Sequence, residues 1–204
     1  MQHFPAFPVN ITMYGKDENI SEDRMIRQVL AGDKDAFRLL VENYQNLVAH
    51  VVFRMVKSRE DREDICQDVF MKIYQNLPGF RGQSKLSTWI ARIAYNTCIN
   101  HLEKKRVLVS NDLMIENYVS ENSDESIHKD IEEGDIKEKL TAAIELLPEI
   151  FRIVVTLYHL EGMKYQEISE VLDKPEGTIK SYLYRARQLL KFALEKKYYK
   201  EEFV

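Results

Sequence analysis

The sequence predicts an all-α protein made of two small helical domains that are joined by an acidic linker. Three observations lead to this fold class. Apolar residues recur at helical spacing along most of the 204-residue chain. Gly and Pro number only 7 and 5, too few for a fold rich in β-turns. The hydrophobic and charged shares, 45% and 30%, are those of a globular protein, and one central stretch departs from them by being strongly acidic.

The first domain is predicted over residues 22–106. It follows residues 1–21, which mix proline, glycine and polar residues without a period, so we expect a flexible N-terminal arm there. The first helix carries Met25, Val29 and Leu30, which we expect to share one buried face.

Two longer helices come next. Either Asp33 or Asp35 can cap the second helix, which carries apolar residues as far as Met55. The third helix is predicted to begin near Asp61, where acidic side chains suit the positive end of the helix dipole, and to stop at Pro78-Gly79.

A fourth helix and an acidic stretch lie in the middle of the chain. Ser87 is the predicted N-cap of this helix, and the basic run Lys104-Lys105-Arg106 is its predicted end. Residues 107–139 then carry ten acidic side chains and three lysines, a net charge of −7. Since Ser120 to Ser126 offer little to bury, we interpret residues 107–139 as a linker.

The second domain is predicted over residues 140–197, with a tail of residues 198–204. A short amphipathic helix ends at Pro148, and another helix starts at Glu149 and stops at Gly162. No strand is required anywhere in the chain.

The most specific local pattern in the second domain is a helix-turn-helix. A helix of about two turns from Tyr165 to Leu172 is followed by a short break and by a longer helix that begins at Glu176. The domain is therefore predicted to be a four-helix unit, similar to a winged helix without the wing. A helical hairpin that only packs against its neighbours is the alternative.

The first turns of the longer helix carry hydrogen-bond donors and a ring, as major-groove readers do. Residues 174–200 have a net charge of +6, although the whole chain has a net charge of −4, and this excess favours DNA binding over simple packing. The candidate DNA-contacting residues are Thr178, Lys180, Ser181, Tyr184, Arg185 and Arg187.

A second basic stretch lies in the first domain. Residues 81–106 have a net charge of +5, and Trp89, Tyr95 and Asn96 are interleaved with the cations. Rings stack on unpaired bases, cations bind phosphates and amides bind base edges, so this pattern is typical of a surface for single-stranded nucleic acid. Trp89 and Tyr95 can equally belong to the core.

The start of the third helix is acidic, with Asp61, Asp64, Gln67 and Asp68 on its first turns. No histidine converges with these residues, so the sequence predicts neither a catalytic nor a metal site there. A solvated acidic face and a surface that docks a partner are the two interpretations.

The remaining features exclude several classes of protein. Cys66 and Cys98 are too few for a disulfide framework or a cysteine-rich zinc site, and we expect both to be buried. No apolar run is long enough to span a membrane, and the N-terminus lacks the pattern of a secretory signal. The expectation is a cytoplasmic protein without a cofactor, a small-molecule substrate or membrane insertion.

These motifs, in this order, resemble the bacterial RNA polymerase sigma factors, specifically the extracytoplasmic-function (ECF) group of the sigma-70 family. Residues 61–70 resemble the polymerase-docking helix of that family, and residues 80–96 resemble its reader of the promoter −10 element. Residues 147–187 resemble its −35 domain. The resemblance covers about residues 25–106 and 138–195.

The resemblance implies roles for particular residues. Those implied to dock the largest subunit of the polymerase are Asp61, Asp64, Gln67 and Asp68. Those implied to capture and melt the −10 element are Phe80, Arg81, Ser84, Lys85, Trp89, Tyr95, Asn96, Lys104, Lys105 and Arg106. The six residues of the longer helix are implied to bind the −35 element, and an anti-sigma factor is implied as a further partner.

The sequence therefore predicts a non-enzymatic promoter-specificity subunit of RNA polymerase. The first alternative is a stand-alone helix-turn-helix regulator that binds DNA as a dimer through residues 140–197, with residues 22–106 as its dimerisation or sensing domain. A helical scaffold that makes no nucleic-acid contact is the second alternative.

Overall fold

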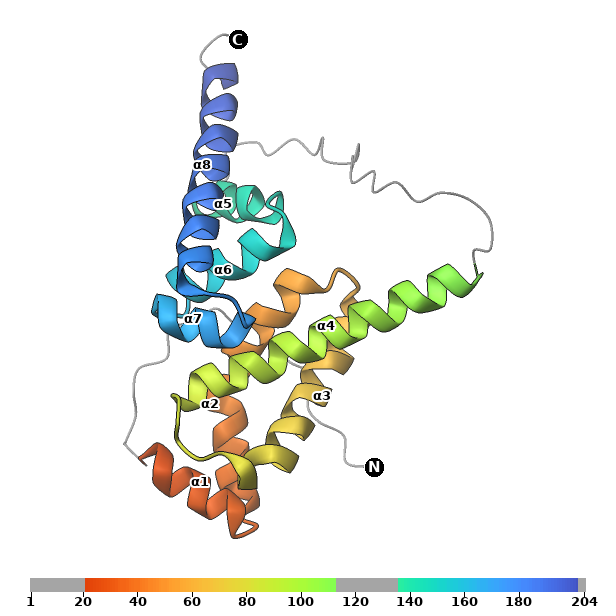
Figure 1. Ribbon diagram of the computed structural model, residues 1–204, viewed down its shortest axis with the longest axis vertical. Helices are drawn as coiled ribbons and strands as arrows, with labels where there is room; N and C mark the ends of the chain where they lie inside the picture. The colour runs from red at the N-terminus through yellow and green to blue at the C-terminus, as the bar shows by residue number, and fades with distance from the viewer. Residues whose placement is uncertain (1–20, 113–135, 202–204) are drawn as a thin grey trace. The chain divides into compact units, whose positions relative to one another are not determined.

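The computed structural model describes the backbone of residues 21–112 and 136–201 and the side chains of residues 21–105 and 140–194. Every regular element in these ranges is helical, which confirms the predicted all-α class (Figure 1). The predicted arm, apart from Ser21, and the centre of the predicted linker lie outside the described residues.

The helices follow one another without a strand in the described ranges. Their bounds are α1 (Glu22–Leu30), α2 (Lys34–Met55), α3 (Arg59–Asn76), the short 3-10 helix η1 (Leu77–Gly79), α4 (Leu86–Asp112), α5 (Ile136–Glu145), α6 (Glu149–His159), α7 (Tyr165–Leu172) and α8 (Glu176–Glu201). The chain divides into two compact units, residues 1–94 and residues 95–204.

The first unit is built around α2, against which α1 and α3 pack. Each helix contributes an apolar stripe to one core, as predicted, and Leu40, Val48, Ile73 and Ile90 are fully buried in it. The expectation for Leu30 is wrong, because this side chain is 49% exposed. On a helix Leu30 lies about 100° away from Val29, which turns it out of the stripe that buries Met25 and Val29.

Asp33, and not Asp35, caps α2. Its Oδ1 accepts hydrogen bonds from the backbone N–H groups of Asp35 and Ala36, at 2.9 and 3.2 Å. These are two of the donors that the start of a helix leaves without an intrahelical partner.

The start and end predicted for α4 are wrong. The N–H of Trp89 bonds to the carbonyl of Lys85 at 3.1 Å, so the helix begins two residues early and Ser87 lies inside its first turn. Burial of Leu86 explains the early start, since this side chain is only 1% exposed. The helix also continues to Asp112, because residues 107–112 include no glycine or proline to end it.

The second unit begins within α4, at Tyr95, and holds α5 to α8, of which α6 and α7 both pack against α8. The carbonyl of Pro148 accepts the first hydrogen bonds of α6, from Phe151 and Arg152 at 2.9 and 3.0 Å. The core of these helices contains Ile153, Leu157, Ile168, Ile179 and Leu183. Helix α6 ends at His159, three residues before the predicted stop at Gly162.

The break between α7 and α8 has the geometry of a helix-turn-helix, which confirms the predicted motif. Asp173 ends α7 in the left-handed conformation, with φ of 51°. Two residues later the carbonyl of Pro175 accepts from the N–H groups of Thr178 and Ile179, at 2.8 and 3.2 Å, and so starts α8. This helix runs to Glu201, four residues beyond its predicted end.

Candidate nucleic-acid interface

The acidic residues predicted to dock a partner lie on the first three turns of α3. The Ser58 hydroxyl caps the helix by accepting from the N–H of Asp61 at 3.3 Å. Asp64, Gln67 and Asp68 are exposed, and their spacing of three and four residues places them on one face of the helix. The opposite face is buried and consists of Ile65, Cys66, Val69, Phe70 and Ile73.

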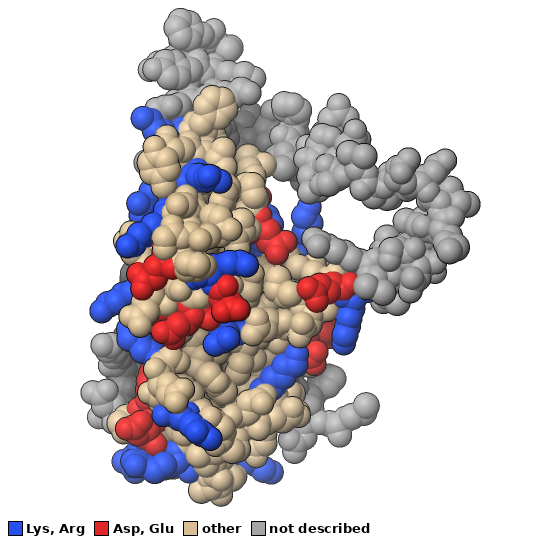
Figure 2. Space-filling view, in the orientation of Figure 1, with Lys and Arg blue, Asp and Glu red and all other residues tan. Residues whose placement is uncertain are grey.

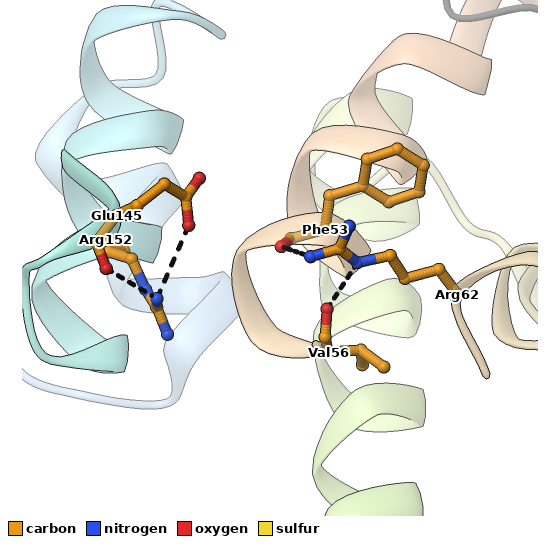
Figure 3. Close-up of polar contacts among 5 residues, drawn as sticks. All are labelled: Phe53, Val56, Arg62, Glu145 and Arg152. Carbon is orange, nitrogen blue, oxygen red and sulfur yellow. Dashed lines mark hydrogen bonds and ion pairs between the residues drawn. The ribbon is translucent and has the colours of Figure 1, made fainter. Parts of the chain in front are cut away.

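Arg62 ties the start of α3 to the end of α2. Its guanidinium donates to the carbonyls of Val56 and Phe53, the second at 3.3 Å, and lies 5.0 Å from the centre of the Phe53 ring (Figure 3). These carbonyls are among those that the end of a helix leaves without an intrahelical donor. Arg62 therefore fixes the orientation from which α3 presents its acidic face.

The loop before α4 carries four of the ten predicted −10 residues, and a fifth, Trp89, lies in the first turn of α4. The rings of Phe80 and Trp89 pack against each other with centroids 5.2 Å apart, and both residues are half-buried. Arg81 and Lys85 are exposed and Ser84 is half-buried. The loop therefore places an aromatic pair beside exposed cations.

Helix α4 presents the other predicted −10 residues. Asn96 is exposed, on the side of the helix away from the fully buried Ala94 and Cys98, whereas Tyr95 is half-buried. Two turns further on, Lys104 and Lys105 are exposed; Arg106 belongs to α4, but its side chain lies outside the described residues. Helix α4 thus exposes an amide side chain and, two turns later, basic side chains.

The buried residues of α8 and its predicted DNA-contacting residues lie on different faces of the helix. Ile179, Leu183 and Ala186 form the buried stripe. The exposed candidates are Lys180, Ser181, Tyr184, Arg185 and Arg187, and Thr178 is half-buried. Basic side chains line the outer edge of α8 (Figure 2). An exposed recognition face backed by a buried stripe is the arrangement that a groove reader requires.

A second arginine joins two of the helices that pack on α8. Arg152, on α6, donates to the carbonyl of Glu145 at 3.0 Å and forms an ion pair with the carboxylate of the same residue at 3.6 Å (Figure 3). The contact closes the turn between α5 and α6, both of which pack on α8.

Three further features of the described residues concern metal ligands, membrane-spanning helices and the cysteines. No group of three His, Cys, Asp or Glu side chains there is arranged to hold a metal ion. No described helix combines the length and the apolar character needed to cross a membrane. Both cysteines are buried, as predicted, and burial with a smaller contribution from Glu63 raises the pKa of the Cys66 thiol to about 12.

Comparison with known proteins assigns the chain to a family. The sigma-70 region 2 model matches residues 40–107, and the sigma-70 region 4 model matches residues 137–190. An ECF RNA polymerase sigma-E factor from Haemophilus influenzae is 37% identical over 183 residues, which cover 85% of this chain and 95% of that protein. The chain belongs to the ECF RNA polymerase sigma factors.

A further relative and a solved structure also match the chain. The RNA polymerase sigma-H factor of Pseudomonas aeruginosa is 35% identical over 182 residues, covering 85% of this sigma factor and 94% of its relative. The sigma factor RpoE from Bartonella quintana, solved in complex with the anti-sigma factor NepR, matches with a TM-score of 0.60 at 22% identity. This match covers 78% of the present chain and 96% of the other, and it shows a shared fold.

The structure of this sigma factor also joins residues that the sequence analysis did not connect. Arg187 lies over the ring of Tyr158, and Lys180 lies over the ring of Tyr165, each 5.5 Å from the ring centre. Neither tyrosine is among the residues that the sequence predicts to contact DNA. Both fall within the region 4 match, but only the packing of α6 and α7 against α8 brings them to the two cations.

Proposed function

We propose that this sigma factor binds core RNA polymerase through the acidic face of α3 and directs it to promoters. Asp61, Asp64, Gln67 and Asp68 dock the polymerase. The loop before α4 and α4 itself capture the −10 element, and α8 binds the −35 element through the residues described above. The observation that carries the proposal is that exposed polar faces, each backed by a buried stripe, occur in both of the regions that match the family models.

The proposed mechanism uses two weak DNA readers on one chain. Each reader makes a few phosphate and base contacts, so its affinity alone is low and sensitive to salt. Once one reader is bound, the other is held at a high effective concentration near its own element. The sigma factor then needs no catalytic centre, since the polymerase in the cytoplasm carries out the chemistry.

An anti-sigma factor is part of the proposal. The resemblance of the sequence to ECF sigma factors implies such a partner, and the RpoE of Bartonella quintana was solved with one. Binding of core polymerase and of an anti-sigma factor should be mutually exclusive if both cover the same faces.

Run-off transcription tests the proposal. Purified core polymerase is given genomic DNA with and without the full-length chain. Transcripts that start at defined sites only when the chain is present are the expected result. An unchanged transcript pattern would remove the promoter-directing function, whatever DNA affinity the chain has by itself.

Arg185→Ala is expected to weaken the −35 contact by about 1–3 kcal/mol, because Arg185 is exposed on α8 at a position that can reach a base edge. Binding of holoenzyme to promoter variants that differ only in the −35 element measures the effect. The preference at one position should relax, and Arg27→Ala, which removes an exposed arginine from α1, is the control. Equal loss on every variant would make Arg185 a phosphate contact.

Asn96→Ala is expected to slow promoter opening about tenfold while initial binding changes little, because one base contact forms only after the strands separate. Permanganate reactivity of unpaired thymines follows opening, and filter binding follows the initial complex. Asn100→Ala removes an exposed amide one turn further along α4 and should leave both measurements close to wild type. Equal losses in the two assays for Asn96→Ala would contradict base capture.

A further inference from the structure

An aromatic stack lies where α6, α7 and α8 meet. The ring of Tyr158, near the end of α6, is nearly parallel to that of Tyr165, the first residue of α7; the interplanar angle is 12° and the centroids are 5.3 Å apart. The guanidinium of Arg187 lies over Tyr158, and the ammonium of Lys180 lies over Tyr165, each at 5.5 Å. One ring from α6 and one ring from α7 thus each contact a cation of α8.

His159 adds a contact to the same guanidinium. Its Nε2 lies 3.5 Å from Nη2 of Arg187, and its ring meets the Tyr158 ring edge to face with centroids 4.8 Å apart. Partial burial and the Arg187 cation lower the pKa of His159, which favours a neutral imidazole that can accept from Arg187. Arg187 is therefore held by a ring face and by a ring nitrogen.

The two held cations lie on one side of α8. Lys180 and Arg187 are seven residues apart, so they share a face and are separated by about 10 Å along the helix axis. Both remain exposed although each contacts a ring. A guanidinium that lies over a ring keeps N–H groups at its edge, and those groups suit the oxygens of a phosphate.

We propose that the Tyr158–Tyr165 stack is a positioning element that orders Arg187 and Lys180 for contact with DNA phosphates beside the −35 element. Tyr158 itself touches no DNA; it acts through Arg187. Long basic side chains lose conformational freedom when they bind, and a side chain that is already ordered loses less. The inference rests on the proposed binding of promoter DNA by α8.

Substitutions at Tyr158 test the role of the ring. Holoenzyme is prepared with the full-length chain, and its complex with a promoter fragment recovered by run-off transcription is measured over a range of salt concentrations. Tyr158→Leu should weaken the complex about two- to fivefold, the size of an exposed cation–π contact. Tyr158→Phe keeps the ring and should behave as wild type.

A double-mutant cycle separates positioning from general stability. The logarithm of the binding constant falls linearly with the logarithm of the salt concentration. Arg187→Gln should make this slope less negative by about 0.9, as expected for one lost phosphate contact. Tyr158→Leu should weaken the complex less in the Arg187→Gln background than in the wild type, because only the support of Lys180 through Tyr165 remains to be lost. Phe151→Leu is the control, since it removes from α6 a ring that packs on Tyr182 at 5.7 Å; it should lower the melting temperature and leave the salt slope unchanged.

Each result has a definite reading. Wild-type affinity and slope for Tyr158→Leu, or full additivity with Arg187→Gln, would overturn the positioning role. If Tyr158→Leu does not fold, the cycle of Tyr165→Leu with Lys180→Gln decides by the same criterion. If wild-type holoenzyme forms no complex that depends on the −35 sequence, then the proposed DNA binding by α8 fails, and not the positioning role alone.

Discussion

Gln67→Ala combined with Asp68→Ala is expected to weaken binding of the sigma factor to core polymerase by about 2–4 kcal/mol. The estimate sums one neutral hydrogen bond and one to a charged group, each lost at an interface that excludes water. Both side chains are exposed on α3, and the residues behind them are buried, so the substitutions remove contact groups without opening the core. Titration of labelled core polymerase with the variant measures the change.

The chain offers a matched control for this experiment. Glu42→Ala with Asn46→Ala also removes one carboxylate and one amide, four residues apart on the exposed side of α2. The control pair should bind polymerase like wild type, and circular dichroism should show unchanged helix content for both variants. Equal affinities of the two double variants would show that the acidic face of α3 is not the docking surface.

Leu183→Ala is expected to destabilise the second unit by about 2–5 kcal/mol, the range for a leucine truncated inside a packed core. Leu183 is 1% exposed and lies in the stripe through which α8 packs on α6 and α7. The helices α5 to α8 span about 66 residues, for which a free energy of unfolding of roughly 3–10 kcal/mol is typical, so this loss populates the unfolded form. Denaturant unfolding followed by circular dichroism measures it, and −35 binding should fall in parallel.

Leu189→Ala is the control for the core substitution. It makes the same change on the same helix, but Leu189 is 42% exposed, and the expected cost is below about 0.5 kcal/mol. Docking to polymerase through α3 should survive Leu183→Ala, because the first unit has a buried core of its own. Similar costs for the two leucines would contradict the assignment of buried and exposed faces on α8.

Local patterns predicted most of the fold. The helix-turn-helix could be predicted because Asp173 and Pro175 lie in a short break between two apolar stripes. A break of this length between two helices is typical of the motif. The buried stripe of α8 follows directly from residues three and four apart. The exposed candidates on α8 follow from the same periodicity, because they occupy the positions left over.

The features that the sequence did not predict depend on tertiary contacts or on small energy differences. Asp33 and Asp35 are both good N-caps, and only the backbone conformation distinguishes them. Ser87 has the chemistry of a cap, but burial of Leu86 starts α4 before it. The contact of Tyr158 with Arg187 joins positions 29 residues apart, which no local period reports.

The sequences upstream of the start sites used by the holoenzyme test the central claim most directly. If one chain carries two readers, mapping of these sites genome-wide should give two shared elements at a nearly constant separation, one near −35 and one near −10. Asn96→Ala should impair recognition of the element near −10, and Arg185→Ala should impair recognition of the element near −35. A single palindromic element, bound equally well without polymerase, would contradict the account.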